Sequence, residues 1–349
     1  MEATDQQTHN LVIFMPPPPI IHWQTHTSVN QDFNPPVASS PPHRPSVPAT
    51  TCTSPASSDG ERRVAPPQTK DAYVEYTQDF VTKNIENFSQ VTDKSVKSIA
   101  EKAATQADII AAELGLRTEI IPGLVKLAFY DFVILCDDSS SMTFDEQHIP
   151  ALRDTLRRVA YFATRLQPKG IAIRFLNHHE GIGKSFDDLT DAHDVDMKVA
   201  SVPFQGNTRL GEVLDAKIVQ PMILKKVQSG KLERPVFVVI ITDGQPTNEH
   251  PGSLRNTIRN CKEVLSHQSY NNAAAIFLIS QIGNDKGATL FLKSLETDQQ
   301  ISSMVFCSTD DLSAKLARLQ STQQDKKYTA WLIELFLAAL DKQTKHAYT

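Results

Sequence analysis

The sequence predicts an α/β fold, in which a doubly wound, mostly parallel sheet carries helices on both faces. Two observations predict it. From about residue 130 onward, apolar strand-like runs alternate with helix-like stretches, which is the order of elements in such sheets. The strand-like runs, such as VFVVIIT at 236–242, are continuously apolar, and strands of this kind are covered on both faces.

Ahead of this domain, residues 1–68 hold thirteen of the 21 prolines, with Ser, Thr and His between them. Such a composition buries too little apolar surface to offset the entropy lost on ordering, so we expect a disordered, proline-rich tail. Its PPPP run at 16–19 suits a polyproline-binding partner, and a purely solvated tail is the alternative.

Residues 69–128 predict a helical lead-in. Val96, Ala103 and Ala107 fall on one face of a helix, and Gly115 is suited to end that helix as its C-cap. We expect the lead-in either to lie against the main domain or to form a small bundle of its own.

The main α/β domain is predicted over residues 129–322. Its candidate strands are FVILCD (132–137), IAIRFL (171–176), VFVVIIT (236–242), AAIFLIS (274–280) and SMVFC (303–307). Its candidate helices lie near 147–166, 187–201, 209–228, 253–267, 286–297 and 310–320.

A C-terminal helix is predicted at 326–345. It contains the apolar run WLIELFLAAL, which is short and interrupted by Glu334. Because a membrane span needs about twenty apolar residues, no membrane span is predicted, and we expect this helix to pack on the domain. An amphipathic helix that binds a partner is the alternative.

Composition narrows the class of protein. The 349 residues carry a formal net charge of −5 and give a pI of about 6.1, which is not the basic footprint of a nucleic-acid-binding protein. The four cysteines show no CxxC spacing, which argues against a zinc site. The early run LVIFM is too short for a signal peptide, so we expect a cytoplasmic protein in a reducing compartment.

Five oxygen-bearing residues follow strand-like runs or stand in a polar loop. Asp137, Ser139 and Ser141 lie in FVILCDDSSSM, Thr208 in GNTRLG and Asp243 in VFVVIITDGQP. Since parallel strands all end at one edge of a sheet, their terminal loops converge on one crevice. Two carboxylates and three hydroxyls meeting there form an all-oxygen pocket, which suits a hard divalent cation such as Mg²⁺.

The string DDSSSM, followed by GNT and ITDG in an alternating βα domain, resembles the von Willebrand factor A-type (vWA) domain. The resemblance covers about half of the chain and is closest to the intracellular, fungal-type members, because the first strand is introduced by AFYDFVILCDDSSSM. It implies a metal-ion-dependent adhesion site. Ser139 and Ser141 would be direct ligands, Asp137 and Asp243 direct or water-mediated ligands, and Thr208 would alternate between the two modes.

Two positions depart from the family pattern. Ser140 and Asn207 stand where the family usually has glycine. Glycine is favoured where the backbone needs a positive φ, which asparagine tolerates better than serine. Neither change removes a ligand, so we expect a competent but weaker site.

These features predict a non-enzymatic protein-interaction module. A magnesium ion, with manganese or calcium as the other candidate cations, would be left with one open coordination position, and an acidic side chain of a partner protein would fill it. No catalytic residue and no organic cofactor are predicted.

Two other functions stay open at this stage. The string HHEGIGKS imitates a phosphate-binding loop, although His178 stands where that motif demands glycine. A phosphate-handling hydrolase would use Lys184 and Asp243. The third reading is a scaffold whose proline-rich tail recruits the partners.

Overall fold

The computed structural model describes residues 67, 69–88, 91–179 and 186–345. The chain divides into two units, Met1–Glu61 and Arg62–Thr349, and the second unit holds every described residue. The predicted proline-rich tail therefore lies outside the described residues, except for Pro67.

A five-stranded sheet forms the centre of the second unit. Its strands are β1 (Asp131–Cys136), β2 (Ile171–Phe175), β3 (Val236–Thr242), β4 (Ala275–Gln281) and β5 (Val305–Asp311). They run in the order β2-β1-β3-β4-β5, and every neighbouring pair is parallel. All seven residues of β3 and all seven of β4 are buried. The predicted α/β fold class is confirmed.

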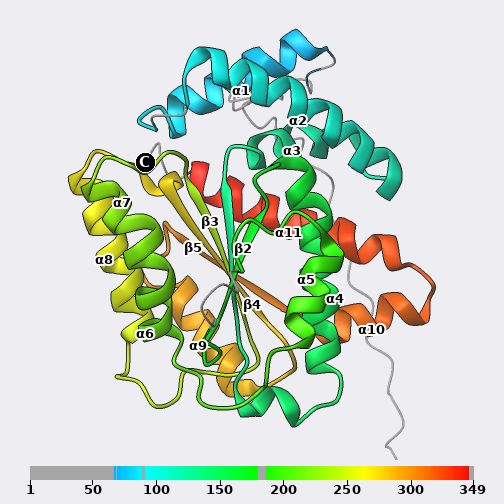
Figure 1. The fold of residues 1–349 in the computed structure, drawn as a ribbon, viewed down its shortest axis with the longest axis vertical. Helices are drawn as coiled ribbons and strands as arrows, with labels where there is room; N and C mark the ends of the chain where they lie inside the picture. The colour runs from blue at the N-terminus through cyan, green and yellow to red at the C-terminus, as the bar shows by residue number, and fades with distance from the viewer. Residues whose placement is uncertain (1–66, 68, 89–90, 180–185, 346–349) are drawn as a thin grey trace, which may run out of the picture. The chain divides into compact units, whose positions relative to one another are not determined.

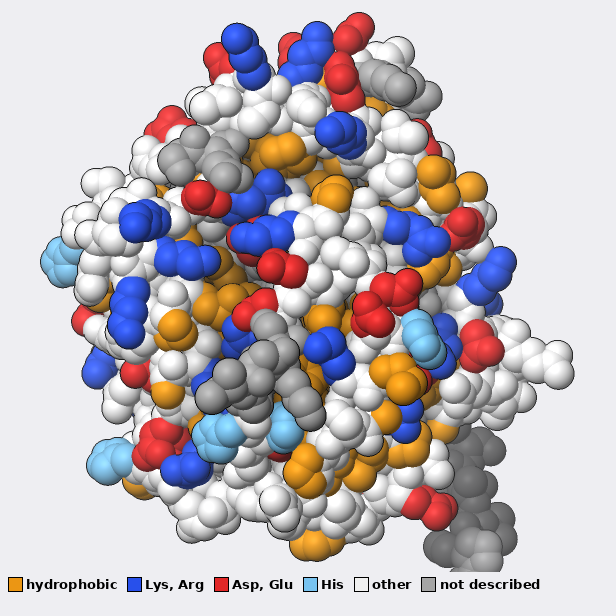
Figure 2. Space-filling model, viewed as in Figure 1, with side chains coloured by type: hydrophobic (Ala, Val, Ile, Leu, Met, Phe, Trp, Pro, Cys, Tyr) orange, Lys and Arg blue, Asp and Glu red, His pale blue; other side chains and the backbone are white. Residues whose placement is uncertain are grey.

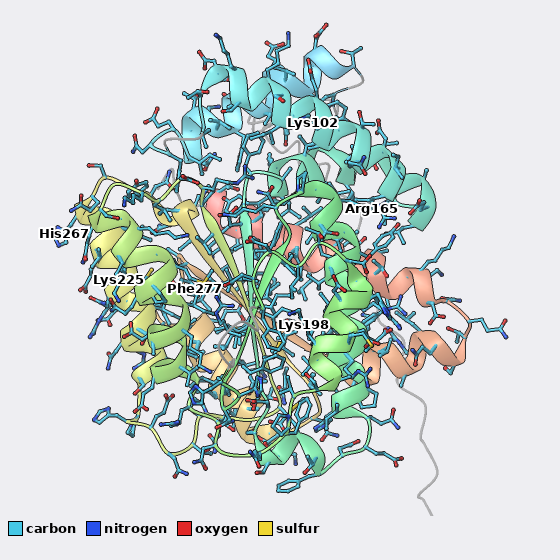
Figure 3. All side chains as sticks on the ribbon, viewed as in Figure 1. Lys102, Arg165, Lys198, Lys225, His267 and Phe277 are labelled. Atoms are coloured by element: carbon cyan, nitrogen blue, oxygen red, sulfur yellow. The ribbon has the colours of Figure 1, made fainter. Side chains whose placement is uncertain are left out.

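Helices cover both faces of this sheet (Figure 1). One layer holds α4 (His148–Leu166), α5 (Ala192–Ala200), α10 (Leu312–Ser321) and α11 (Asp325–Lys345). The other holds α6 (Leu210–Leu214), the π-helical stretch η3 (Asp215–Leu224), α7 (Lys225–Gln228) and α8 (Ser253–His267). Helix α9 (Lys286–Glu296) packs on β4 and β5. Phe277, labelled in Figure 3, is a fully buried residue of β4 between these layers.

One predicted helix begins later than expected. Residues 187–191 are not helical: Leu189 pairs with Ile171 as an antiparallel bridge, and the backbone of Phe186 accepts a hydrogen bond from Ile173. Helix α5 starts after Asp191, whose side chain accepts a hydrogen bond from the amide of His193. The sheet edge at β2 is thereby lined by a non-helical segment.

The helical lead-in shares the core of the sheet. Its helices are α1 (Lys70–Asn84), α2 (Asp93–Leu114), the 3₁₀ turn η1 (Thr118–Ile120) and α3 (Ile121–Leu127). Helix α2 begins at a capping box between Thr92 and Ser95 and ends at Gly115, whose φ of +65° is left-handed. The buried face of α2 contacts α1, α3, α4 and α11, and belongs to the same apolar cluster as the strands.

Helix α11 is held on the sheet by an aromatic cluster. The ring of Phe336 stacks on Phe237 of β3 with centroids 5.0 Å apart and planes 9° apart, and it meets Phe162 of α4 edge-on at 5.2 Å. Near the start of the helix, Tyr328 shares a buried hydrogen bond of 2.8 Å with Thr155. Within the described residues, none of the helices combines the length and the apolar character needed to cross a bilayer.

Candidate functional site

The order of the strands places the topological switch point of the sheet between β1 and β3. The chain leaves β1 toward β2 on one side, whereas β3, β4 and β5 follow on the other. Loops diverge at such a switch point, and ligands of open α/β sheets bind there, at the carboxyl ends of the strands. Asp137 directly follows β1 and Asp243 directly follows β3. The amide of Asp137 donates to the carbonyl of Ile241 at 2.9 Å, so the two loops begin side by side.

All five predicted site residues form one hydrogen-bonded cluster at this switch point. The hydroxyls of Ser139 and Ser141 are 2.9 Å apart, and Ser141 donates to Oδ1 of Asp243 at 2.9 Å. The hydroxyl of Thr208 donates to that of Ser139 at 3.2 Å. The amide of Ser139 donates to Oδ1 of Asp137 at 2.9 Å. Three loops that are far apart in sequence therefore bring their oxygens together.

The two carboxylates of the cluster are buried. Asp137 is 0% exposed and Asp243 is 6% exposed, whereas Ser141 is half-buried and reaches the surface. Oδ2 of Asp137 accepts a 2.6 Å hydrogen bond from Thr242. Burial, together with the charge of Asp137, raises the pKa of Asp243 to about 6. The site is thus a buried acidic cluster in which the negative charges of Asp137 and Asp243 repel one another.

A third buried carboxylate, that of Asp138, holds together the loops around the cluster. Asp138 is 0% exposed, and its side chain accepts hydrogen bonds of 2.7 Å from the amides of Asn177 and His178. Its own carbonyl accepts from the amide of Gln205 at 2.7 Å. Burial raises the pKa of Asp138, and the two amide hydrogen bonds oppose that rise. This residue therefore ties the loop after β1 to the loop after β2 and to the Thr208 loop.

Glycine is needed at one position of the Thr208 loop. Gly206 has φ of +99°, and a Cβ there would lie 2.4 Å from Oδ1 of Asn177. Ser140 and Asn207, where the resemblance led us to expect glycine, are not among the residues with positive φ. Instead, Ser140 and Gly206 exchange two hydrogen bonds, of 3.2 and 3.1 Å. Neither Ser140 nor Asn207 adopts a left-handed conformation, so the expectation that these positions need a positive φ is wrong.

The loop after β3 is fastened to the Thr208 loop. Thr208 and Thr247 exchange hydrogen bonds, with the amide of Thr208 3.1 Å from the hydroxyl of Thr247 and the amide of Thr247 2.9 Å from the carbonyl of Thr208. The carboxylate of Glu249 accepts from the amides of Gly211 and Glu212, each at 3.0 Å. The position of Thr208 is thereby set by contacts on both sides.

The donor set of the cluster fits a hard cation. Among residues 67, 69–88, 91–179 and 186–345, no group of three or more His, Cys, Asp or Glu side chains is arranged to hold a metal ion. The cluster offers two carboxylates and three hydroxyls, so a cation bound here would depend on neutral oxygens as well as charged ones. Such ligands suit Mg²⁺, which keeps part of its water shell, better than Zn²⁺, which favours nitrogen and sulfur.

Several residues at the site were not singled out from the sequence as neighbours of the cluster. Thr242 and Asn177 reach the acidic residues through the fold alone, and His148, in the first turn of α4, lies beside Asp243. No spacing rule connects them, because the contacts join positions up to about a hundred residues apart. The adjacency of Thr242 to Asp243 was the one available signal.

The phosphate-loop imitation lies mostly outside the described residues. Residues 180–185, which include Lys184, are not described. His178 is described, and its ring packs edge-on against Phe175 and Phe186, with centroids 6.1 and 5.9 Å away. This histidine is therefore held in an aromatic contact.

Comparison with known proteins does not assign the chain to a family. No family model and no curated protein matches the chain. Among solved structures, proximal thread matrix protein 1 from the mussel byssus is similar over 57% of this chain and 48% of that chain, with 14% sequence identity and a TM-score of 0.34. The chain thus matches about half the length of that structure, and so distant a likeness carries no argument about function.

Proposed function

We propose that this chain is a non-enzymatic, vWA-type protein-binding module whose cluster of Asp137, Ser139, Ser141, Thr208 and Asp243 binds Mg²⁺. In this proposal the cation captures an acidic side chain of a partner protein. One observation carries it: the three hydroxyls and two carboxylates, drawn from three loops, form a single hydrogen-bonded cluster at the switch point of the sheet.

The charge balance of the cluster supports cation binding. Asp137 and Asp243 are buried near one another, and this proximity contributes to the raised pKa of Asp243. A cation placed between them would relieve that repulsion. The hydroxyls of Ser139 and Ser141 are neutral, so the chain's own ligands would leave the ion with residual positive charge.

One member of the cluster reaches the surface, which supports partner capture. Ser141 is half-buried and its neighbour Ser140 is exposed, so the rim of the cluster, formed by these two serines, is open to solvent. When bound, Mg²⁺ would supply a hard centre that accepts a further oxygen ligand, which a carboxylate of a partner provides. The loops that surround it are held by Asp138 and Thr247, so the chain presents this rim in a defined arrangement.

The same proposal places the module in the cytoplasm. Cys136, Cys261 and Cys307 are free and buried, and burial raises the pKa of each thiol. Free buried cysteines are typical of proteins in reducing compartments, which supports this placement.

An affinity pull-down from cell extract, in Mg²⁺ and in EDTA, tests the function. Wild-type protein should recover partners in Mg²⁺ that are lost in EDTA. The Asp137→Ala variant should fail to recover these partners even in Mg²⁺. Ser321→Ala, at the exposed end of α10, is the matched control and should behave as wild type. Recovery of the same interactors under both conditions would overturn the proposal.

Two further variants separate the competing functions. Deleting residues 1–68 should leave Mg²⁺-dependent capture intact, and loss of capture would favour the proline-rich scaffold. Nucleotide hydrolysis that disappears in Lys184→Ala would favour the hydrolase instead.

A further inference from the structure

One imidazole nitrogen beside the cluster is buried without a hydrogen-bond partner. His148 is the first residue of α4, and its side chain is 13% exposed. Its Nδ1 atom is among the few buried polar side-chain atoms of the described residues that lack a partner. Nδ1 lies 3.7 Å from Oδ2 of Asp243, and Nε2 lies 3.9 Å from Oδ2 of Asp145.

The ring of His148 is confined on its opposite side by Gly283. A Cβ at Gly283 would lie 2.4 Å from Nε2 and 2.8 Å from Cε1, so the ring packs directly against the backbone of the loop after β4. That loop is itself fixed, because the amide of Gly283 donates to Oδ1 of Asp311 at 2.8 Å. The ring therefore has little room to withdraw from Asp243.

The two oxygens of Asp243 face different neighbours. Oδ1 accepts the hydrogen bond of Ser141, within the cluster. Oδ2 faces Nδ1 of His148, at a separation somewhat longer than a hydrogen bond. An approach of roughly 0.5–1 Å brings the pair into the usual 2.7–3.2 Å range. Because a carboxylate only accepts, the proton must then lie on Nδ1.

We infer that His148 is a positioning residue of the cation site: its Nδ1–H donates to Oδ2 of Asp243 and so holds Oδ1 toward Ser141 and the bound cation. This inference rests on the proposed function for its role in cation binding. Partners of this kind, which orient a metal ligand, typically change metal affinity about 10–100-fold when they are removed.

The test compares three variants by titration calorimetry with Mn²⁺ alone. His148→Phe keeps a ring of similar size without nitrogen, and should weaken Mn²⁺ binding about 10–100-fold. His148→Asn keeps a donor near the position of Nδ1 and should restore most of the affinity. His267→Phe, at the exposed end of α8 and labelled in Figure 3, is the control and should bind as wild type. Thermal unfolding of each variant confirms that it is folded.

Equal Mn²⁺ affinity in wild type and His148→Phe would overturn the inference and leave the proposed function standing. So would equal losses in His148→Phe and His148→Asn, since a lost donor would not explain them. If wild type binds no Mn²⁺, the proposed function fails. The contact between His148 and Asp243 can then still be tested in the cation-free protein. Long-range ¹H–¹⁵N spectra of ¹⁵N-histidine protein should then show the Nδ1–H tautomer at His148, converted by Asp243→Ala; an Nε2–H tautomer in wild type would overturn the inference.

Discussion

The hydroxyl of Ser141 donates a 2.9 Å hydrogen bond to Oδ1 of Asp243, 102 positions further along the chain. Ser141 lies in the 3₁₀ turn η2 (Ser140–Thr143) that follows β1, whereas Asp243 follows β3. This bond joins the two loops that flank the switch point of the sheet. A substitution in either loop should therefore alter the position of side chains in the other.

Removing one hydroxyl of the cluster should weaken cation binding without unfolding the protein. Ser141→Ala deletes a proposed ligand and the donor to Asp243, so we expect at least about a tenfold loss of Mn²⁺ affinity, comparable to the loss of an orienting partner. Calorimetric titration measures it, with Ser321→Ala as the control. Unchanged affinity would mean that Ser141 is not a ligand.

The cation-free protein should lose stability as the pH rises toward 6. Burial and the neighbouring Asp137 raise the pKa of Asp243 from 3.8 to about 6 in the folded state. Between these two values the folded state holds the proton more tightly than the unfolded state, so this contribution is fully present below about pH 4 and is lost as the pH rises through about 6. Denaturant unfolding in EDTA checks it, as the difference in free energy of unfolding between wild type and Asp243→Asn. A difference that stays constant from about pH 4 to 7 would contradict the prediction.

Magnesium should stabilise the protein more at neutral than at acidic pH. A proton and a cation compete for the carboxylate of Asp243, whose pKa is about 6. We therefore expect a larger increase in Tm on adding Mg²⁺ at about pH 7.5 than at about pH 5. Differential scanning fluorimetry measures both shifts, and Asp243→Asn should abolish the difference between them. An equal shift at both values of pH would argue that the ion binds elsewhere.

Phe144 should contribute to partner capture but not to stability or to cation binding. It is 84% exposed, three positions after Ser141, and its amide donates to the carbonyl of Ser141 at 2.9 Å, so its backbone is held at the rim. On the face seen in Figure 2, acidic and basic side chains are interspersed with hydrophobic ones, which is the ordinary character of a protein surface. Phe144→Ala should reduce Mg²⁺-dependent recovery of partners while leaving Tm and Mn²⁺ affinity unchanged.

The control for Phe144 is Ile109→Ala, which removes a partly exposed apolar side chain from α2. It should leave recovery unaltered. Equal recovery by both variants would show that the aromatic ring at the rim takes no part in binding.

Asn177 should affect both the stability of the fold and the cation site. Its side chain donates to Oδ1 of Asp138 at 3.2 Å and to the carbonyl of Asn207 at 3.0 Å, and it accepts from the amide of Asn207 at 3.1 Å. Asn177→Ala should lower the free energy of unfolding by about 1–3 kcal/mol, because buried groups of Asp138 lose a partner. It should also weaken Mn²⁺ binding, since the Thr208 loop is released. Denaturant unfolding and calorimetry measure the two effects, and a stable variant with normal affinity would contradict this role of Asn177.

The sheet could be predicted closely because its signal is local. Strand β3 was predicted over the residues that form it, since seven apolar residues in a row leave few other choices. The segment 187–191 was wrongly assigned to a helix, because its acidic residues gave no sign that Leu189 would pair with the edge of β2. Pairing of that kind depends on a partner strand that is distant in sequence.

Some residues of the candidate site could likewise be predicted from local sequence, whereas others could not. Asp137 and Asp243 could be placed from the strands that they follow, and the shared edge of a parallel sheet does the rest. The hydrogen-bond partners of Asp138 and the position of His148 beside Asp243 could not be foreseen. Asp138 accepts hydrogen bonds from amides of a loop about forty positions away. The ring of His148 packs against Gly283, which lies in the loop after β4. Such neighbours follow from tertiary packing and leave no periodic pattern in the chain.

The buried carboxylate of Asp138 has a consequence for how anything binds at this rim. Its hydrogen bonds join three loops when the chain folds, before any ligand arrives. A ligand that reaches the cluster meets preorganised loops, and the entropy of immobilising them does not weaken its affinity. Association at this surface should therefore be limited by how fast water and ligand exchange rather than by a slow rearrangement of the backbone.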